Sequence, residues 1–68
     1  MHQARGIVTE FDNLRGIGTV TTHDGRTLAF HCTAIAGGTR SIAEGTSVVV
    51  EVAPGLPGRW EAVVVTPA

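Results

Sequence analysis

Apolar and polar side chains alternate along much of the chain, which is the pattern of half-buried β-strands. The clearest run places Val48, Val50 and Val52 at every second position. Runs of this kind predict five strands: Gly6–Asp12, Arg15–Thr22, Thr27–Cys32, Thr46–Ala53 and Arg59–Thr66. The residues before Gly6 lack the pattern, so Met1–Arg5 is predicted to be a frayed end.

Turn residues separate these runs and limit the fold class. Asp24-Gly25 between two strand-like runs is a strong hairpin signal. The other predicted connections are turns at Asn13-Leu14 and Glu44-Gly45, a helical turn at Thr33–Ile35 and a loop at Pro54–Gly58. Five short strands without a long helix predict an all-β fold. Because closure hides strand edges, we expect one domain that forms a small five-stranded antiparallel Greek-key barrel.

The same alternation predicts the core. Counting by two along the third strand puts Leu28 and Phe30 on the inner face and Ala29 and His31 on the outer face. The predicted core residues are Val8, Val20, Leu28, Phe30, Ile35, Val48, Val50, Val52 and Val64. Ile35 and Ile42 are expected to fill the open end of the barrel.

Size and composition fit a single small domain. The 68 residues are 43% apolar, which is enough for one core. No apolar run is long enough to cross a bilayer, and no signal-peptide pattern is present, so we expect a cytoplasmic protein with no membrane partner. The single cysteine, Cys32, agrees with a reducing compartment. The net charge of −1 is not the basic footprint of a protein held mainly by phosphate contacts.

Two glycines alternate with side chains in the stretch Arg15-Gly16-Ile17-Gly18-Thr19-Val20. Glycine inside a strand usually marks a bulge, a bend or the close approach of another group. The glycines clear one face, and the row on the other face is Arg15, Ile17 and Thr19. We expect this row to meet whatever the sheet contacts.

Three motifs together resemble one known family from end to end. They are Gly6-Ile7-Val8 with Phe11-Asp12, the stretch from Arg15 to Val20, and Leu28-Ala29-Phe30-His31-Cys32-Thr33-Ala34-Ile35. Their order is similar to that of the bacterial cold-shock domain, with Gly-Lys-Val-Lys-Trp-Phe-Asn, Lys-Gly-Phe-Gly-Phe-Ile and Val-Phe-Val-His-Phe-Ser-Ala-Ile. The resemblance implies an oligonucleotide-binding barrel.

The chain departs from that family at the aromatic residues on which bases stack. The matching positions hold Glu10, Ile17, Thr19, Ala29 and Cys32. Stacking contributes about 1–3 kcal/mol per base, so the loss of three rings should weaken binding at least about a hundredfold. Glu10 also brings a carboxylate near the phosphates.

The candidate binding residues each have a second interpretation. Arg15 is either a phosphate contact or a solvated charge, and His31 either contacts a base or is an ordinary exposed histidine. Phe11 either offers a stacking ring or covers the end of the core. Trp60, beside Arg59, is either a stacking or interface residue or a cap on the barrel.

Catalysis, metals and cofactors have no signal in the sequence. No Ser/His/Asp set, paired acids or phosphate-binding loop is apparent. Cys32 follows His31, but adjacent strand residues point to opposite faces, and no second pair stands at ligand spacing. We therefore predict neither an enzyme nor a metal or cofactor site.

Two functions are consistent with these residues. The first is weak binding of single-stranded DNA or RNA through Phe11, Arg15, Ile17, Thr19, His31, Arg59 and Trp60. The alternative is a protein-interaction module that keeps the barrel but has lost nucleic-acid binding. In that case Ile17, Ala29 and Cys32 on the outward face would contact a protein partner or a second copy of the chain.

Overall fold

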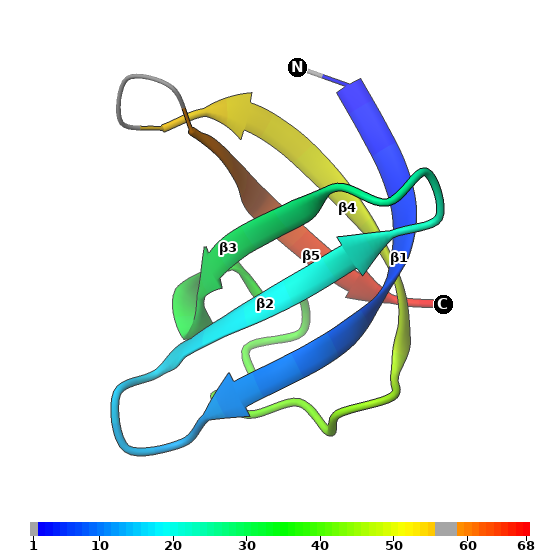
Figure 1. The fold of residues 1–68 in the computed structure, drawn as a ribbon. Coiled ribbons are helices and arrows are strands. Elements are labelled where there is room, and N and C mark those ends of the chain that lie inside the picture. Colours follow the sequence, from blue (N-terminus) through cyan, green and yellow to red (C-terminus); the bar gives the residue numbers. More distant parts are fainter. Residues whose placement is uncertain (1, 56–58) are drawn as a thin grey trace.

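The computed structural model describes residues 2–55 and 59–68, which form five strands and one 3-10 turn (Figure 1). The elements are β1 (His2–Asp12), β2 (Ile17–Thr22), β3 (Thr27–His31), η1 (Cys32–Ala34), β4 (Ser47–Pro54) and β5 (Trp60–Pro67). All five predicted strands are present, with shifted ends. The predicted loop at Pro54–Gly58 falls partly on residues 56–58, which lie outside the described residues.

The strands close into a barrel in the order β1-β2-β3-β5-β4, and β4 pairs with β1 to complete it. The predicted five-stranded barrel is confirmed. Four strand pairs are antiparallel, as predicted, but β3 and β5 run parallel and pair at Ala29 and Glu61. Neither strand follows the other directly in the chain, so their relative direction is set by barrel closure and not by a hairpin turn.

The first strand is longer than predicted because it pairs with two neighbours. Residues 2–7 pair with β4, from His2 opposite Val52 to Ile7 opposite Ser47, and residues 6–12 pair with β2. The prediction of a frayed end is therefore wrong for residues 2–5. The sequence of this segment has no clear alternation of apolar and polar residues, but its backbone groups complete the ladder with β4.

A β-bulge in β1 decides which of its side chains face the core. The β1–β2 register shifts between Val8 and Glu10, so Thr9 has no residue opposite it. Val8 and Phe11, three positions apart, both turn inward, while Thr9 and Glu10 are exposed. The bulge thus brings a ring to the core and a carboxylate to the outer face.

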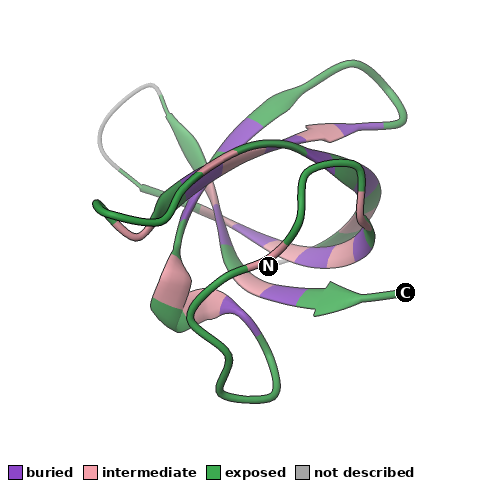
Figure 2. Ribbon diagram, turned by 90° about the horizontal axis from the view of Figure 1, so that it is seen from below, coloured by how far each residue is buried: buried purple, intermediate pink, exposed green. Residues whose placement is uncertain are grey.

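The barrel interior is filled mainly by aliphatic side chains, and Figure 2 shows the buried positions along the strands. The buried core residues are Val8, Val20, Leu28, Phe30, Ile35, Val48, Val50, Val52, Ala62 and Val65. Ile42 packs against them, as predicted. The prediction fails at Val64, which is only half-buried, because a register shift in the β4–β5 pair turns Ala62 and Val65 inward.

The second strand begins two residues later than predicted, at Ile17. Arg15 and Gly16 belong to the preceding turn, where Gly16 has a φ of +66°, a conformation that glycine adopts without strain. Asp12 holds this turn, because its Oδ1 accepts hydrogen bonds from the backbone N–H groups of Leu14 and Arg15 at 3.0 and 3.1 Å. The backbone of Arg15 is therefore fixed just before β2.

Gly18 lies on the inner face of β2, where two aromatic rings come close to its backbone. A Cβ there would stand 2.6 Å from Phe30 Cζ and 2.8 Å from both Phe11 Cδ1 and the Glu10 carbonyl oxygen. Gly18→Ala is therefore expected to destabilise the fold by about 1–3 kcal/mol, as measured by urea unfolding. In a Phe30→Leu background the cost should be smaller, and an equal cost in both backgrounds would contradict ring overlap as its cause.

Candidate nucleic-acid interface

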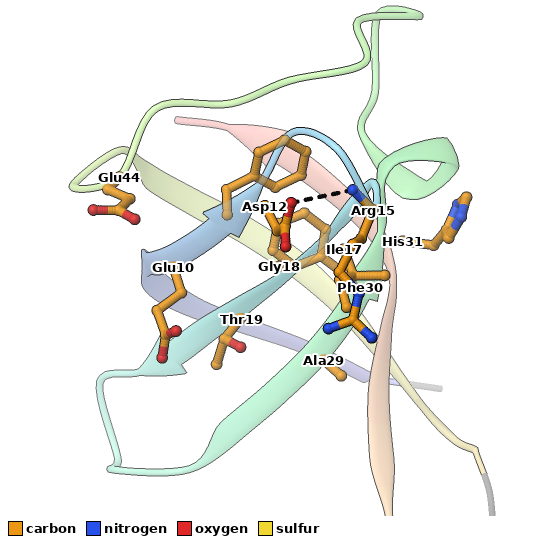
Figure 3. Close-up of a pocket in the computed structure, with 11 residues that line it drawn as sticks. Glu10, Asp12, Arg15, Ile17, Gly18, Thr19, Ala29, Phe30, His31 and Glu44 are labelled. Carbon is orange, nitrogen blue, oxygen red and sulfur yellow. Dashed lines mark hydrogen bonds between the residues drawn. The ribbon is translucent and has the colours of Figure 1, made fainter.

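Outward side chains of β1, β2 and β3, the turn before β2 and the segment before β4 line a hollow of about 430 Å³, together with the inward-facing Gly18 and Phe30 (Figure 3). This feature, the Arg15 hollow, is lined by Glu10, Phe11, Asp12, Arg15, Ile17, Gly18, Thr19, Ala29, Phe30, His31 and Glu44. Five of the seven binding residues predicted from the sequence lie here: Phe11, Arg15, Ile17, Thr19 and His31.

Two phenylalanine rings stack beside each other in the Arg15 hollow. The ring centroids of Phe11 and Phe30 are 5.9 Å apart, and the ring planes differ by 18°. Phe30 is buried, and Phe11 is half-buried and packs against the core. Phe11 therefore packs against the core, which is one of its two predicted roles, while its exposed part lines the hollow.

The predicted outward row is confirmed at its strand positions. Ile17 is 41% exposed, Ala29 is exposed and Thr19 is half-buried. Thr19 and Ala29 lie opposite each other on β2 and β3, and Ile17 lies opposite His31. At Ile17, Thr19 and Ala29 the hollow presents small or aliphatic surface, where a stacked base would need a ring.

Charge in the Arg15 hollow is unfavourable for a polyanion. Among its described lining residues, the carboxylates of Glu10, Asp12 and Glu44 outnumber the guanidinium of Arg15. Figure 3 shows Glu10 and Glu44 on one side of the hollow and Arg15 on the other. Asp12 accepts two backbone hydrogen bonds, whereas Glu10 and Glu44 are exposed carboxylates that would repel a phosphate.

His31 caps the 3-10 turn that follows β3. Its Nδ1 accepts a hydrogen bond from the Thr33 backbone N–H at 3.2 Å and lies 3.0 Å from Thr33 Oγ1. With Nδ1 as acceptor, the neutral ring carries its proton on Nε2. His31 is exposed, and Figure 3 shows its ring at the edge of the hollow and directed away from it.

The sequence predicted that the side chains of Cys32 and His31 point to opposite faces, and this prediction is wrong. Cys32 Sγ lies 3.8 Å from His31 Nδ1, because Cys32 begins η1 and no longer follows the alternation of the strand. Its half-buried side chain packs against the core. In residues 2–55 and 59–68, no three His, Cys, Asp or Glu side chains gather as metal ligands.

A second hollow, of about 400 Å³, adjoins the first across β2 and β3. This Trp60 hollow is lined by Thr19, Arg26, Thr27, Leu28, Ala29, Arg59 and Trp60. The two remaining predicted residues, Arg59 and Trp60, lie here, and Trp60 is 46% exposed. Because Thr19 and Ala29 line both hollows, the two form one continuous surface.

Arg26 lies in the Trp60 hollow, although the sequence analysis did not select it. Its Nε donates to both carboxylate oxygens of Asp24, at 3.1 and 3.3 Å. A hydrogen bond from the Thr22 hydroxyl, together with the Arg26 guanidinium, lowers the pKa of Asp24. The only sequence signal for Arg26 was its place just before a predicted strand.

No protein-family model matches this chain, and no curated protein matches it. A functional assignment therefore rests on the two hollows and the side chains that line them. Within the described residues, no helix is long and apolar enough to cross a membrane.

Proposed function

We propose that this protein is a cold-shock-like barrel that binds single-stranded DNA or RNA weakly across the Arg15 and Trp60 hollows. The supporting observation is that all seven residues selected for binding line these two adjoining hollows, although they come from separate strands and turns. Arginines supply phosphate contacts, and an exposed tryptophan supplies a surface on which a base stacks. A single strand needs both kinds of contact.

Weak binding follows from the side chains at the centre of this surface. Ile17, Thr19 and Ala29 offer no ring, and each stacked base is worth about 1–3 kcal/mol. The carboxylates of Glu10 and Glu44 add repulsion at the Arg15 hollow. We expect a Kd in the micromolar range or weaker at moderate salt.

Titration of labelled oligo-dT and oligo-U, followed by fluorescence anisotropy, tests this proposal. Glu10→Lys should tighten binding and steepen its salt dependence, because an attractive charge replaces a repulsive one beside the strand. Glu51→Lys is the matched control, since Glu51 lies on β4 and lines neither hollow. Nanomolar binding by the unmodified chain, or an equal effect of the two substitutions, would contradict the proposed surface.

A protein-interaction function is the second candidate, because apolar side chains are exposed beside the Arg15 hollow. Leu14, in the turn between β1 and β2, is 100% exposed, and Ile17 is 41% exposed. On this alternative the face around Ile17 and Ala29 contacts a protein partner or a second copy. Concentration-dependent association that Ile17→Arg abolishes, with no oligonucleotide binding at any salt concentration, would favour it.

A further inference from the structure

The parallel pairing of β3 with β5 brings two arginines into one hollow. Parallel strands start at the same end of a sheet, so the residues just before β3 and just before β5 become neighbours. Those residues are Arg26 and Arg59, and both line the Trp60 hollow with Trp60 itself. The pairing of Ala29 with Glu61 sets this arrangement.

The two hollows differ in charge. Among its described lining residues, the Trp60 hollow has two arginines and no carboxylate, whereas the Arg15 hollow has three carboxylates and one arginine. Of the nearest acids by sequence, Asp24 offsets part of the Arg26 charge, whereas Glu61 is turned toward Gly55. Asp24 is bonded to the Nε of Arg26, and the Glu61 carboxylate lies against Gly55, where an added Cβ would stand 2.6 Å from Oε1. A phosphate is therefore favoured in the Trp60 hollow and disfavoured near Glu10.

The chemistry of the lining matches one nucleotide. Trp60 is 46% exposed, and an indole ring accepts any base by stacking. Arg26 and Arg59 are exposed arginines; the Nε of Arg26 is bonded to Asp24, so its terminal N–H groups, with the guanidinium of Arg59, would bind phosphate oxygens. Thr19 on β2 and Thr27 on β3 add hydroxyl groups to the lining of the hollow. A planar base with an attached phosphate would meet all three kinds of group at once.

We propose that the Trp60 hollow is the anchoring subsite of the strand, where one base stacks on Trp60 and its phosphate contacts Arg26 and Arg59. This inference rests on the proposed single-strand binding and assigns most of the affinity to one end of the surface. The nucleic-acid strand then continues past Thr19 and Ala29 into the Arg15 hollow, where its contacts add little to the affinity.

The test is anisotropy titration of a labelled oligo-dT over a range of salt concentrations, with each variant first checked for folding by circular dichroism. Trp60→Leu should weaken binding between about fivefold and about a hundredfold, and Trp60→Phe should retain most of the affinity. Arg26→Ala and Arg59→Ala should each lower the slope of log K against log salt by about 0.7. Arg15→Ala should lower the slope less than either of these variants, and the distant Arg5→Ala should leave it nearly unchanged.

Competition experiments separate a strand subsite from a site for a free nucleotide. An abasic strand of the same length should compete much less well than oligo-dT, because it cannot stack on Trp60. Thymidine monophosphate should compete at least about tenfold less well than a short oligo-dT, which makes further contacts along the surface. Equal competition by the monophosphate would overturn the assignment to a strand.

Two failures would be distinguishable. If the wild type binds oligo-dT but Arg15→Ala weakens binding more than Trp60→Leu and Arg59→Ala, the anchoring subsite is wrong and single-strand binding stands. If neither oligo-dT nor oligo-U binds the folded wild type even at low salt, the proposed function itself fails, and the subsite with it.

Discussion

Phe30→Ala is expected to destabilise the domain by about 3–5 kcal/mol, which is the usual cost of removing a buried ring. The ring is only 4% exposed and stacks on Phe11 with centroids 5.9 Å apart. The whole stability of a chain of this length is about 3–10 kcal/mol, at roughly 0.05–0.15 kcal/mol per residue. The variant should therefore lose a large part of its stability, and it should be unfolded at room temperature if the wild-type stability lies near the lower end of this range; circular dichroism and urea titration would measure the loss.

Phe30→Leu is the matched control for this prediction. It keeps an apolar side chain at the position and leaves a smaller cavity, so it should cost clearly less than Phe30→Ala. A change in unfolding free energy below about 1 kcal/mol for Phe30→Ala would mean that this ring is not a main support of the core.

Aromatic rings introduced on the outer face should strengthen the proposed single-strand binding at least about a hundredfold. The variant combines Ile17→Phe, Thr19→Phe and Ala29→Phe, and each new stacked base contributes about 1–3 kcal/mol. These side chains lie on the outward face of β2 and β3, and strands accept aromatic residues there. Because Thr19 and Ala29 border both hollows, the new rings would extend the stacking surface from Trp60 toward Arg15.

The matched control places leucine at the same three positions. Leucine adds apolar area without an aromatic face, so the gain in affinity should be much smaller than with phenylalanine. Anisotropy titration with pyrimidine-rich strands measures both variants. If the phenylalanine variant folds and gains nothing, or if leucine serves equally well, base stacking on this face is not the source of affinity.

Local pattern was enough to predict the fold class and most of the core. Val48, Val50 and Val52 are buried because one face of β4 meets the interior, and this requirement leaves a period of two in the sequence. The outward placement of Ile17 and Ala29 follows from the same rule. These predictions needed no knowledge of which strands are neighbours.

The core prediction fails at Val64 because the neighbouring strand changes the count. At Thr9, and again between Glu51 and Val52, the paired strands shift register, and the inward face moves by one residue. The second shift explains why Val65 is buried in place of Val64. A bulge forms where two residues of one strand lie opposite a single residue of the partner strand. The sequence of the bulged strand alone therefore does not predict it.

The sequence by itself determined the five strands, their two faces and the absence of aromatic rings at Ile17, Thr19 and Ala29. Only the tertiary structure decided that Arg26 lies in the same hollow as Arg59 and Trp60. The physical reason is that side chains alternate in the same way whichever direction a strand runs. The alternation therefore specified which face of its strand each side chain lies on. The parallel pairing of β3 with β5, which closes the barrel, decided which residues of different strands lie side by side.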